Sequence, residues 1–256
     1  LHAGLLRDVS PVWSDYLTNC LFRIAVPTFL VINGYYLERQ LDRGVWPWAK
    51  RMAIFYGLWM AIYAPLWVPG AIRVPPYGRE VIFFGYYHLW YLLALLLAGL
   101  MVAGLRHSRL FGWAAAATFL GGVAVQYAGN LHLVPPLDET LNRVQTYRNF
   151  LLVGFPYLAL GVLIARHEAR LSRLASLPLL VASLALLSAE WGANSLWNPQ
   201  ERVFEVFLSL GIVCPVLFLT VIIAFITDKM ISPRLGAYDP KLAAEGTVTE
   251  QGAVLS

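Results

Sequence analysis

Two ionisable side chains lie in largely apolar surroundings, where they could take part in acid–base or charge-stabilising chemistry. Arg23 falls within an apolar stretch, four residues before Pro27. A guanidinium at membrane depth is costly, so we expect Arg23 to face a helix bundle or a water-filled cavity; snorkelling to the nearby interface is the alternative. His88 opens another apolar stretch beside Trp90. An imidazole can exchange protons near neutral pH, although a histidine in this setting is also an ordinary interfacial anchor.

Further polar side chains could bind a substrate. Asn33 precedes Gly34 in the same stretch as Arg23, where the amide could bond across helices or to a ligand and the glycine allows close helix approach. Glu190 follows a later apolar stretch, and its carboxylate could orient a histidine, bind a hydroxylated substrate or be a solvated loop group. A basic cluster suits an anionic partner, although topology and anionic lipid also explain it. The cluster comprises Arg39, Arg43, Lys50 and Arg51.

Seven apolar stretches must position these side chains. Hydrophobic residues make up 59% of the chain and charged residues 13%, whereas a soluble domain has about 25% charged residues. A water-soluble domain of this composition would expose large apolar patches. A bilayer-spanning helix needs about 20 mostly apolar residues, and its backbone polar groups must be satisfied internally. We therefore predict an all-α, polytopic bundle of transmembrane helices, with seven spans at 21–37, 50–69, 88–105, 112–128, 150–165, 174–189 and 203–227.

The basic residues sort by loop. Segments 38–51, 106–111 and 166–173 and the region after the last stretch together carry twelve Lys and Arg, and the alternate segments carry six. Because Lys and Arg stay on the cytoplasmic side, we place the first set inside and the alternate loops, including 70–87, outside. An aromatic belt at the inner interface would then contain Trp46, Trp48 and Trp113. The net charge of +4 forms no basic stripe, so we expect no nucleic-acid partner.

Segment 22–37 resembles the signature second helix of the acyltransferase-3 family, which are integral-membrane O-acyltransferases that modify surface and exported glycans. The segment reads Phe-Arg-Ile-Ala-Val-Pro-Thr-Phe-Leu-Val-Ile-Asn-Gly-Tyr-Tyr-Leu, with Leu30 where the family commonly has Phe and Asn33 where it has Ser. The family's His-Leu-Trp-Phe/Tyr-Leu motif is similar to residues 88–92. The basic pair 50–51 and the segment 148–161 also look like family helices, and the resemblance extends from residue 1 to about residue 227.

The resemblance implies an activity and roles for individual residues. It implies acyl-CoA, commonly acetyl-CoA, as donor and a carbohydrate hydroxyl as acceptor, with no metal. His2 falls where the family has its catalytic first-helix histidine, so it would be the general base or a transient acyl carrier. Arg23 would stabilise the developing oxyanion. The acceptor would contact His88, Trp90, Asn33 and Glu190, and the CoA phosphates would bind Arg39, Arg43, Lys50 and Arg51.

The family fold has ten helices, so by resemblance this chain lacks the first helix and the last ones. We expect a membrane acyltransferase bundle over residues 1–235, incomplete at its N-terminus, followed by a flexible polar tail over 236–256. The protein is expected to be a multi-pass integral component of a bacterial inner (plasma) membrane. Its partners would be membrane lipid, acyl-CoA and a glycan or glycolipid acceptor.

Two other interpretations stay open. A transporter or flippase for a lipid or sugar would use Arg23 and the outer aromatic residues as a pathway, without a thioester and without dependence on His2. A truncated remnant would be inactive. The sequence does not decide which sugar is modified, which acyl chain is used, whether the acyl group passes through a covalent enzyme intermediate, or whether subunits pair.

Overall fold

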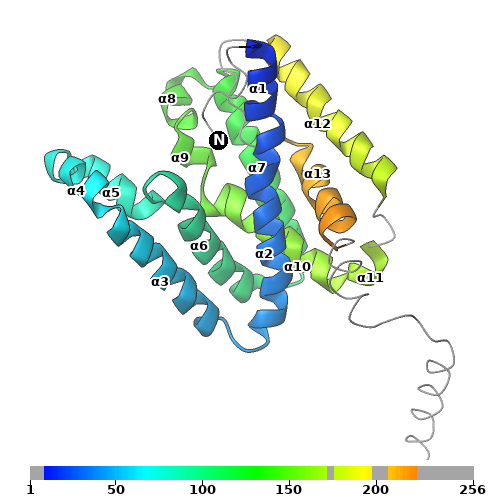
Figure 1. The fold of residues 1–256 in the computed structure, drawn as a ribbon, viewed down its shortest axis with the longest axis horizontal. Coiled ribbons are helices and arrows are strands. Elements are labelled where there is room, and N and C mark those ends of the chain that lie inside the picture. Colours follow the sequence, from blue (N-terminus) through cyan, green and yellow to red (C-terminus); the bar gives the residue numbers. More distant parts are fainter. Residues whose placement is uncertain (1–8, 172–175, 198–206, 224–256) are drawn as a thin grey trace, which may run out of the picture.

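The computed structural model describes residues 9–171, 176–197 and 207–223. In this part of the chain every regular element is a helix, which confirms the all-α prediction. Figure 1 shows the arrangement of these helices. In chain order they are α1 (Pro11–Asn19), η1 (Leu21–Ile24), α2 (Ala25–Leu41), α3 (Trp46–Ile62), α4 (Ala64–Arg73), α5 (Pro75–Phe84), η2 (Tyr87–Leu89), α6 (Trp90–Leu105), α7 (Phe111–Asn130), η3 (Pro135–Leu137), α8 (Asp138–Leu141), α9 (Val144–Tyr147), the π-helical η4 (Phe150–Gly154), α10 (Phe155–Arg166), α11 (Glu168–Leu171), α12 (Leu177–Trp197), α13 (Leu210–Leu217) and the π-helical η6 (Phe218–Ile223).

Several of these helices are long and apolar enough to cross a membrane. By length and composition, the described residues contain three such segments, Pro11–Leu41, Tyr87–Leu105 and Leu177–Leu196. The segments Phe150–Arg166 and Leu210–Val221 are apolar but shorter. Together they support a multi-pass membrane protein, while the predicted number of seven spans goes beyond what these lengths establish.

The stretch predicted as one span at 50–69 is bent. α3 ends at Ile62, and α4 leaves it at an angle of 74°, so the two helices make a fourth candidate span only as a broken pair. Pro65 lies in the first turn of α4. Its nitrogen has no hydrogen to donate, and its ring crowds the carbonyl four residues earlier, which breaks a helix. α4 then packs against α5, so the predicted loop 70–87 is largely helical.

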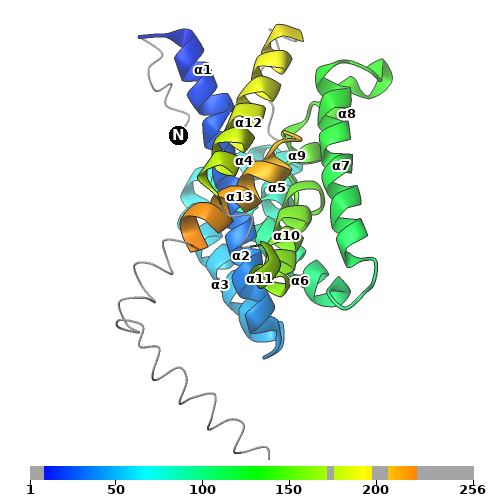
Figure 2. The same ribbon diagram turned by 90° about the vertical axis from the view of Figure 1, so that its right-hand side faces the viewer.

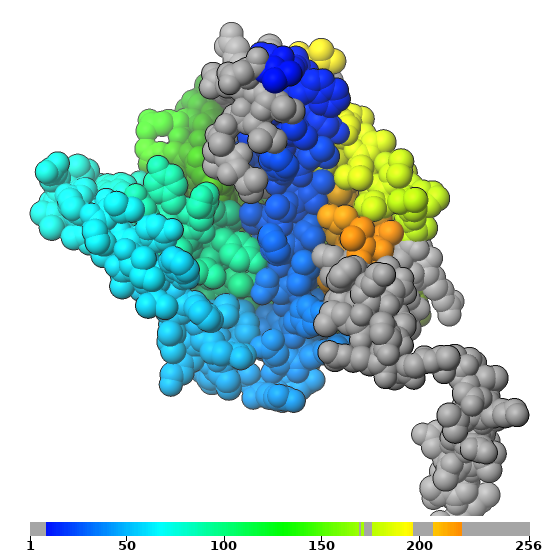
Figure 3. All heavy atoms as spheres, in the orientation of Figure 1, coloured from blue at the N-terminus to red at the C-terminus, as the bar shows by residue number. Residues whose placement is uncertain are grey.

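The arm formed by α3, α4 and α5 makes one flank of the molecule, coloured blue to cyan in Figure 3. Many of its exposed large side chains are apolar, and an exposed apolar surface of this kind is typical of a membrane contact. The exposed apolar residues of this arm include Ile54, Phe55, Leu58, Ile62, Leu66, Ile72, Ile82 and Phe83.

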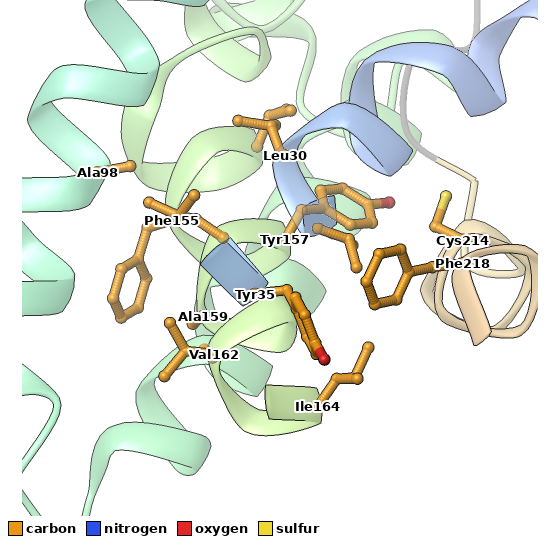
Figure 4. Packing of buried hydrophobic residues seen from close by; sticks show 14 of the residues in the cluster. Leu30, Tyr35, Ala98, Phe155, Tyr157, Ala159, Val162, Ile164, Cys214 and Phe218 are labelled. Atoms are coloured by element: carbon orange, nitrogen blue, oxygen red, sulfur yellow. The ribbon is translucent and has the colours of Figure 1, made fainter. Parts of the chain in front are cut away.

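The centre of the bundle is the crossing of α2 and α10. A Cβ at Gly34 would collide with the backbone carbonyl of Leu158, and a Cβ at Gly161 would collide with that of Val31. The two backbones therefore approach as closely as glycine permits, as small residues allow in membrane helix packing. Buried side chains surround the crossing, and Figure 4 shows Tyr35, Tyr157, Phe155, Cys214 and Phe218 among them.

Three helices end together at one end of the bundle, which Figure 1 and Figure 2 show as the lower end. Glu38 of α2 accepts a hydrogen bond from Nε of Arg166 over 2.6 Å and lies 3.7 Å from Nη1 of Arg106. Arg166 also donates to the backbone carbonyl of Arg106 over 2.8 Å. These contacts place the loops after α2, α6 and α10 at the same end, as the predicted alternation of loops requires.

The aromatic belt predicted for this end is wrong at one position. Trp46 and Trp113 are exposed by 75% and 76%, as interfacial residues would be, but Trp48 is buried. Its ring lies against Gly99 of α6, where a side chain larger than hydrogen would collide with it. Trp48 therefore packs α3 onto α6, because the missing side chain of Gly99 leaves room for an indole. The predicted tail, 236–256, lies outside the described residues.

Candidate functional site

A cavity of about 310 Å³ brings together four side chains that are far apart in the sequence. Arg23 comes from η1, His88 and Trp90 come from η2 and the start of α6, and Arg148 comes from the turn before η4. The structure therefore places Arg23 in a cavity, as expected for a guanidinium in an apolar stretch. The remaining lining residues are mostly apolar: Thr18, Phe22, Ala25, Val26, Pro27 and Val153.

The guanidinium of Arg23 is oriented by hydrogen bonds that run along α1. Its Nη2 donates to Oδ1 of Asn19 over 3.1 Å, and Nδ2 of Asn19 donates to Oδ1 of Asp15 over 2.7 Å. The spacing of four residues puts all three side chains on one helical face. At the Asn19 contact the guanidinium meets a neutral oxygen, so this contact fixes its direction without offsetting its charge.

His88 is carried into the cavity wall by a tight turn between α5 and α6. Gly85 has a φ of 83° and Tyr87 a φ of 50°. A Cβ at Gly85 would come within 2.5 Å of the backbone nitrogen of Trp90. For Tyr87 the left-handed conformation costs roughly 1–2 kcal/mol. The turn thus presents His88 and Trp90 to the cavity from the same end of α6.

Arg148 is the residue of this site to which sequence reasoning gave no role. Its guanidinium carbon lies 5.3 Å from the ring centroid of Trp90, within the range of a cation–π contact. Asn149 fixes the turn, because its Oδ1 accepts from the backbone nitrogens of Leu151 and Leu152, each over 2.9 Å. The available signal was a basic residue directly before an apolar stretch. It is ambiguous, since topology also puts arginines there.

Trp90 and Arg148 also line a larger cavity of about 600 Å³ between α5, α6 and η4. The stacked pair therefore forms a wall that the two cavities share. Arg79 and Glu80 of α5 contribute charged groups to the larger cavity, whereas most of its lining is apolar: Phe83, Phe84, Leu93, Ala94, Leu97, Phe150 and Leu151.

Asn33 and Glu190, which the sequence suggested as acceptor contacts, do not line the Arg23 cavity. Nδ2 of Asn33 donates to Oη of Tyr91 over 3.0 Å, which ties α2 to α6. The carboxylate of Glu190 accepts from the backbone nitrogens of Leu208 and Ser209, each over 2.8 Å. It also accepts from Oγ of Ser209 over 2.5 Å and from Oη of Tyr127 over 3.0 Å. Glu190 thus holds the chain just before α13.

The predicted anion-binding cluster lies at the end of the bundle where α2 stops and α3 begins. All four of its members, Arg39, Arg43, Lys50 and Arg51, are exposed. Two of them already contact other side chains: Nη2 of Arg39 lies 3.6 Å from Oε2 of Glu168, and Nη2 of Arg51 donates to Oε1 of Gln40 over 3.0 Å. The length of α2, at 1.5 Å per residue, separates this cluster from Arg23 by about 25 Å.

His2, the predicted catalytic histidine, lies outside the described residues, so its distance from Arg23 stays a prediction. Among the residues that the structure does describe, no group of three or more His, Cys, Asp or Glu side chains could hold a metal ion. The cavity therefore offers two guanidiniums, an imidazole and an indole. These groups can stabilise a developing negative charge and position a polar ligand.

Comparisons with known proteins place the chain by its sequence. Residues 2–238 match a family model described as an acyltransferase domain, that of the acyltransferase-3 family. No curated protein matches the chain, and no solved structure matches it.

Proposed function

We propose that this chain, which belongs to the acyltransferase-3 family and is by that membership a membrane acyltransferase, moves an acyl group from acyl-CoA to a hydroxyl of an exported or cell-surface carbohydrate. The observation that carries the proposal is the cavity that Arg23, His88, Trp90 and Arg148 share. It lies at the end of α2 opposite to the exposed basic cluster. A cytoplasmic anionic donor and an exported acceptor call for two such sites on opposite sides of a membrane domain.

The chemistry needs a base, an oxyanion partner and a positioned acceptor. The acceptor oxygen attacks the thioester carbonyl carbon, its proton passes to a general base, and the carbon–sulfur bond breaks. The CoA thiolate leaves and takes up the proton. We assign the base, or a transient acyl carrier, to His2. Arg23 would stabilise the oxyanion, because a preoriented cation acts most strongly where water is excluded. His88 and Trp90 would shape the acceptor side.

On the donor side, the CoA phosphates would bind the exposed cations of the basic cluster through charge-assisted contacts. Arg43 and Lys50 are the better candidates, because Arg39 would have to share its charge with Glu168. The separation of about 25 Å along α2 means that the thioester reaches inward between the helices or that the acyl group is relayed. Acetyl is the acyl group that the family resemblance favours.

The test is transfer of radiolabelled acetyl from acetyl-CoA to lipid-linked or polymeric glycan by the protein in lipid nanodiscs. Arg23→Gln should lower kcat by about 10²–10³, the usual effect of losing one oxyanion-stabilising donor, with little change in the KM for acetyl-CoA. Arg43→Gln together with Lys50→Gln should instead raise that KM. Arg109→Gln, an exposed arginine in the turn between α6 and α7, is the matched control and should leave both constants unchanged.

Normal turnover by His2→Ala would remove His2 from the mechanism, and normal turnover by Arg23→Gln would remove the oxyanion role. Movement of a lipid or sugar across the membrane without any dependence on CoA would favour a transporter instead. In that case the Arg23 variant should slow transport, and the double variant of the basic cluster should have no effect.

A further inference from the structure

A third cavity, to which the proposed chemistry gives no role, opens beside His88. It has a volume of about 410 Å³, and we call it the aromatic cup. Four of its side chains form a chain of rings: Trp59 and Tyr63 stack at 5.9 Å between centroids, Tyr63 and Tyr86 lie at 5.9 Å, and Tyr86 and Tyr87 at 5.0 Å. The lining residues of the aromatic cup are Trp59, Tyr63, Leu66, Tyr86, Tyr87, His88 and Leu89.

We propose that the aromatic cup seats one neutral sugar ring of the carbohydrate acceptor, with His88 at the passage toward Arg23. The proposal rests on the acyltransferase function above and deepens it, because it names the part of the acceptor that this end of the bundle recognises. His88 lines both the aromatic cup and the Arg23 cavity. A ring held in the cup therefore has a hydroxyl within reach of the cavity where we place the reaction.

The lining favours a sugar ring over a lipid chain or an anion. Aromatic faces carry a negative quadrupole and suit the C–H faces of a pyranose. The phenols and the imidazole at the rim can bond to the hydroxyls around the ring. An alkyl chain would use none of these polar groups. No Asp, Glu, Lys or Arg is among the lining residues, so the cup offers no fixed charge to a uronate or a phosphate.

The backbone at Tyr87 points to the same use. Tyr87 holds a φ of 50°, although the residue is 76% exposed and gains little from burial. A strained backbone conformation whose energetic cost is not offset by packing contacts is typical of a ligand-binding position. Its ring lies against Tyr86 at 5.0 Å and His88 at 6.2 Å between centroids, facing its neighbours along the rim.

Apolar side chains back part of the cup, and the Tyr86 phenol in its lining has a raised pKa. A small apolar cluster of Met60, Val81 and Leu89 packs against two of the rings, those of Tyr63 and Tyr86. The pKa of the Tyr86 phenol is raised, mainly by desolvation and further by the nearby phenols of Tyr77, Tyr87 and Tyr63. This hydroxyl therefore remains a hydrogen-bond donor over the whole neutral range.

The cup also lies on the side where an exported acceptor would arrive. α3 begins at Trp46, beside the basic cluster, and Trp59 lies about 20 Å further along the helix axis. The rings thus belong to the end of the bundle opposite to the proposed donor site.

Direct binding tests this without requiring catalysis. Saturation-transfer difference NMR on the full chain in nanodiscs would use neutral trisaccharides of glucose, mannose and galactose as probes, and trigalacturonate as the anionic counterpart. At least one neutral probe should bind through its C–H protons, and trigalacturonate should not displace it. Binding of none of the neutral probes, or equal binding of the anionic one, would overturn the proposal.

Three variants locate the site. Tyr87→Asn removes the ring but keeps a residue that tolerates the left-handed backbone, so it should weaken binding about tenfold, as expected for one aromatic contact. Trp59→Ala should do the same. Trp13→Ala, an aromatic residue of α1 that is 60% exposed and does not line the cup, should bind like the unaltered protein. Equal weakening in all three variants, or in none, would contradict the proposed site.

Kinetics separate this proposal from the function it rests on. In the acetyl-transfer assay, Tyr87→Asn should raise the KM for the carbohydrate about tenfold and leave the KM for acetyl-CoA unchanged. If Tyr87→Asn transfers acetyl with an unchanged KM for the carbohydrate, the aromatic cup is not the acceptor site, and the acyltransferase proposal is unaffected. Sugar binding with no transfer to any carbohydrate would sink the proposed reaction and leave the cup as a sugar site.

Discussion

Replacing Gly34 by alanine should destabilise the protein by forcing α2 and α10 apart. The new Cβ would collide with the carbonyl of Leu158, and because this obstacle is backbone, no side-chain rotation can relieve it. Overpacking a dense interior costs about 1–3 kcal/mol, which exceeds the gain of up to about 1 kcal/mol in helix propensity. We expect a net loss of about 1–2 kcal/mol, or about 2–8 °C in Tm for a chain of this size.

The chain carries its own reporter for measuring this loss of thermal stability. Its two cysteines, Cys20 and Cys214, are both free and buried, so a thiol-reactive fluorophore labels them only when the bundle opens on heating. Gly104→Ala is the matched control. Gly104 lies in α6, and a Cβ there meets nothing within 4 Å. The control should therefore keep or raise the labelling midpoint through helix propensity alone.

The reciprocal glycine supplies a sharper test. Gly161→Ala should cost about as much as Gly34→Ala, because its Cβ collides with the carbonyl of Val31 across the same crossing. One separation of the helices relieves both collisions, so the double variant should lose less stability than the sum of the two single losses. If Gly34→Ala melts at or above the temperature of Gly104→Ala, the close crossing of α2 and α10 is not what holds the bundle together.

Three further changes test individual contacts. Asn149→Ala removes the acceptor of two backbone N–H groups at the start of η4, so it should lower the free energy of unfolding by about 1–2 kcal/mol in thermal unfolding. By loosening Arg148 it should also lower the transfer rate. Asn149→Asp keeps the acceptor oxygen and should restore much of the stability and of the transfer rate. Glu190→Gln replaces one acceptor oxygen by an amide nitrogen that cannot accept, so it should cost about 2 kcal/mol and speed fluorophore labelling of Cys214 below the melting temperature. Unchanged labelling would mean that α13 is anchored elsewhere. Glu38→Gln removes the negative charge that Arg106 and Arg166 share, so it should lower Tm by an amount equivalent to about 1.5–3 kcal/mol. The difference in Tm from the unaltered protein should become smaller in high salt. A difference in Tm that salt does not affect would argue against an ionic contact.

Much of the fold follows from the chain itself. The apolar stretches predict helices because a backbone in hydrocarbon has no other way to satisfy its polar groups. The loop charges predict which loops share an end, and the contacts of Glu38 with Arg106 and Arg166 agree with that alternation. The motif around Arg23 indicated the family that the match over residues 2–238 shows.

Local composition predicted the structure least well where a helix bends and where a residue type common at the membrane interface is buried between helices. After the basic pair at its start, the stretch 50–69 is uncharged and mostly apolar, yet the chain bends near Pro65 and α4 leaves α3 at 74°. Trp48 is of a residue type expected at a membrane interface, but it is buried against Gly99. The space for its ring comes from the partner helix α6, so it could not be predicted from the sequence around Trp48.

The sequence by itself determined the class of the protein: it showed apolar helical segments suited to a membrane, an arginine within one of them, Arg23, that requires a cavity or a polar partner, and the motifs of an acyltransferase family. Only the tertiary structure decided which side chains share a site. It joined Arg148 to Trp90, tied Glu190 to the start of α13 and Asn33 to Tyr91, and set the aromatic cup beside His88. The physical reason is that hydrophobic periodicity and charge act along a single helix, whereas a site is made where helices distant in sequence cross. Those crossings depend on the volumes of residues such as Gly34 and Gly161, which carry no chemical signal of their own.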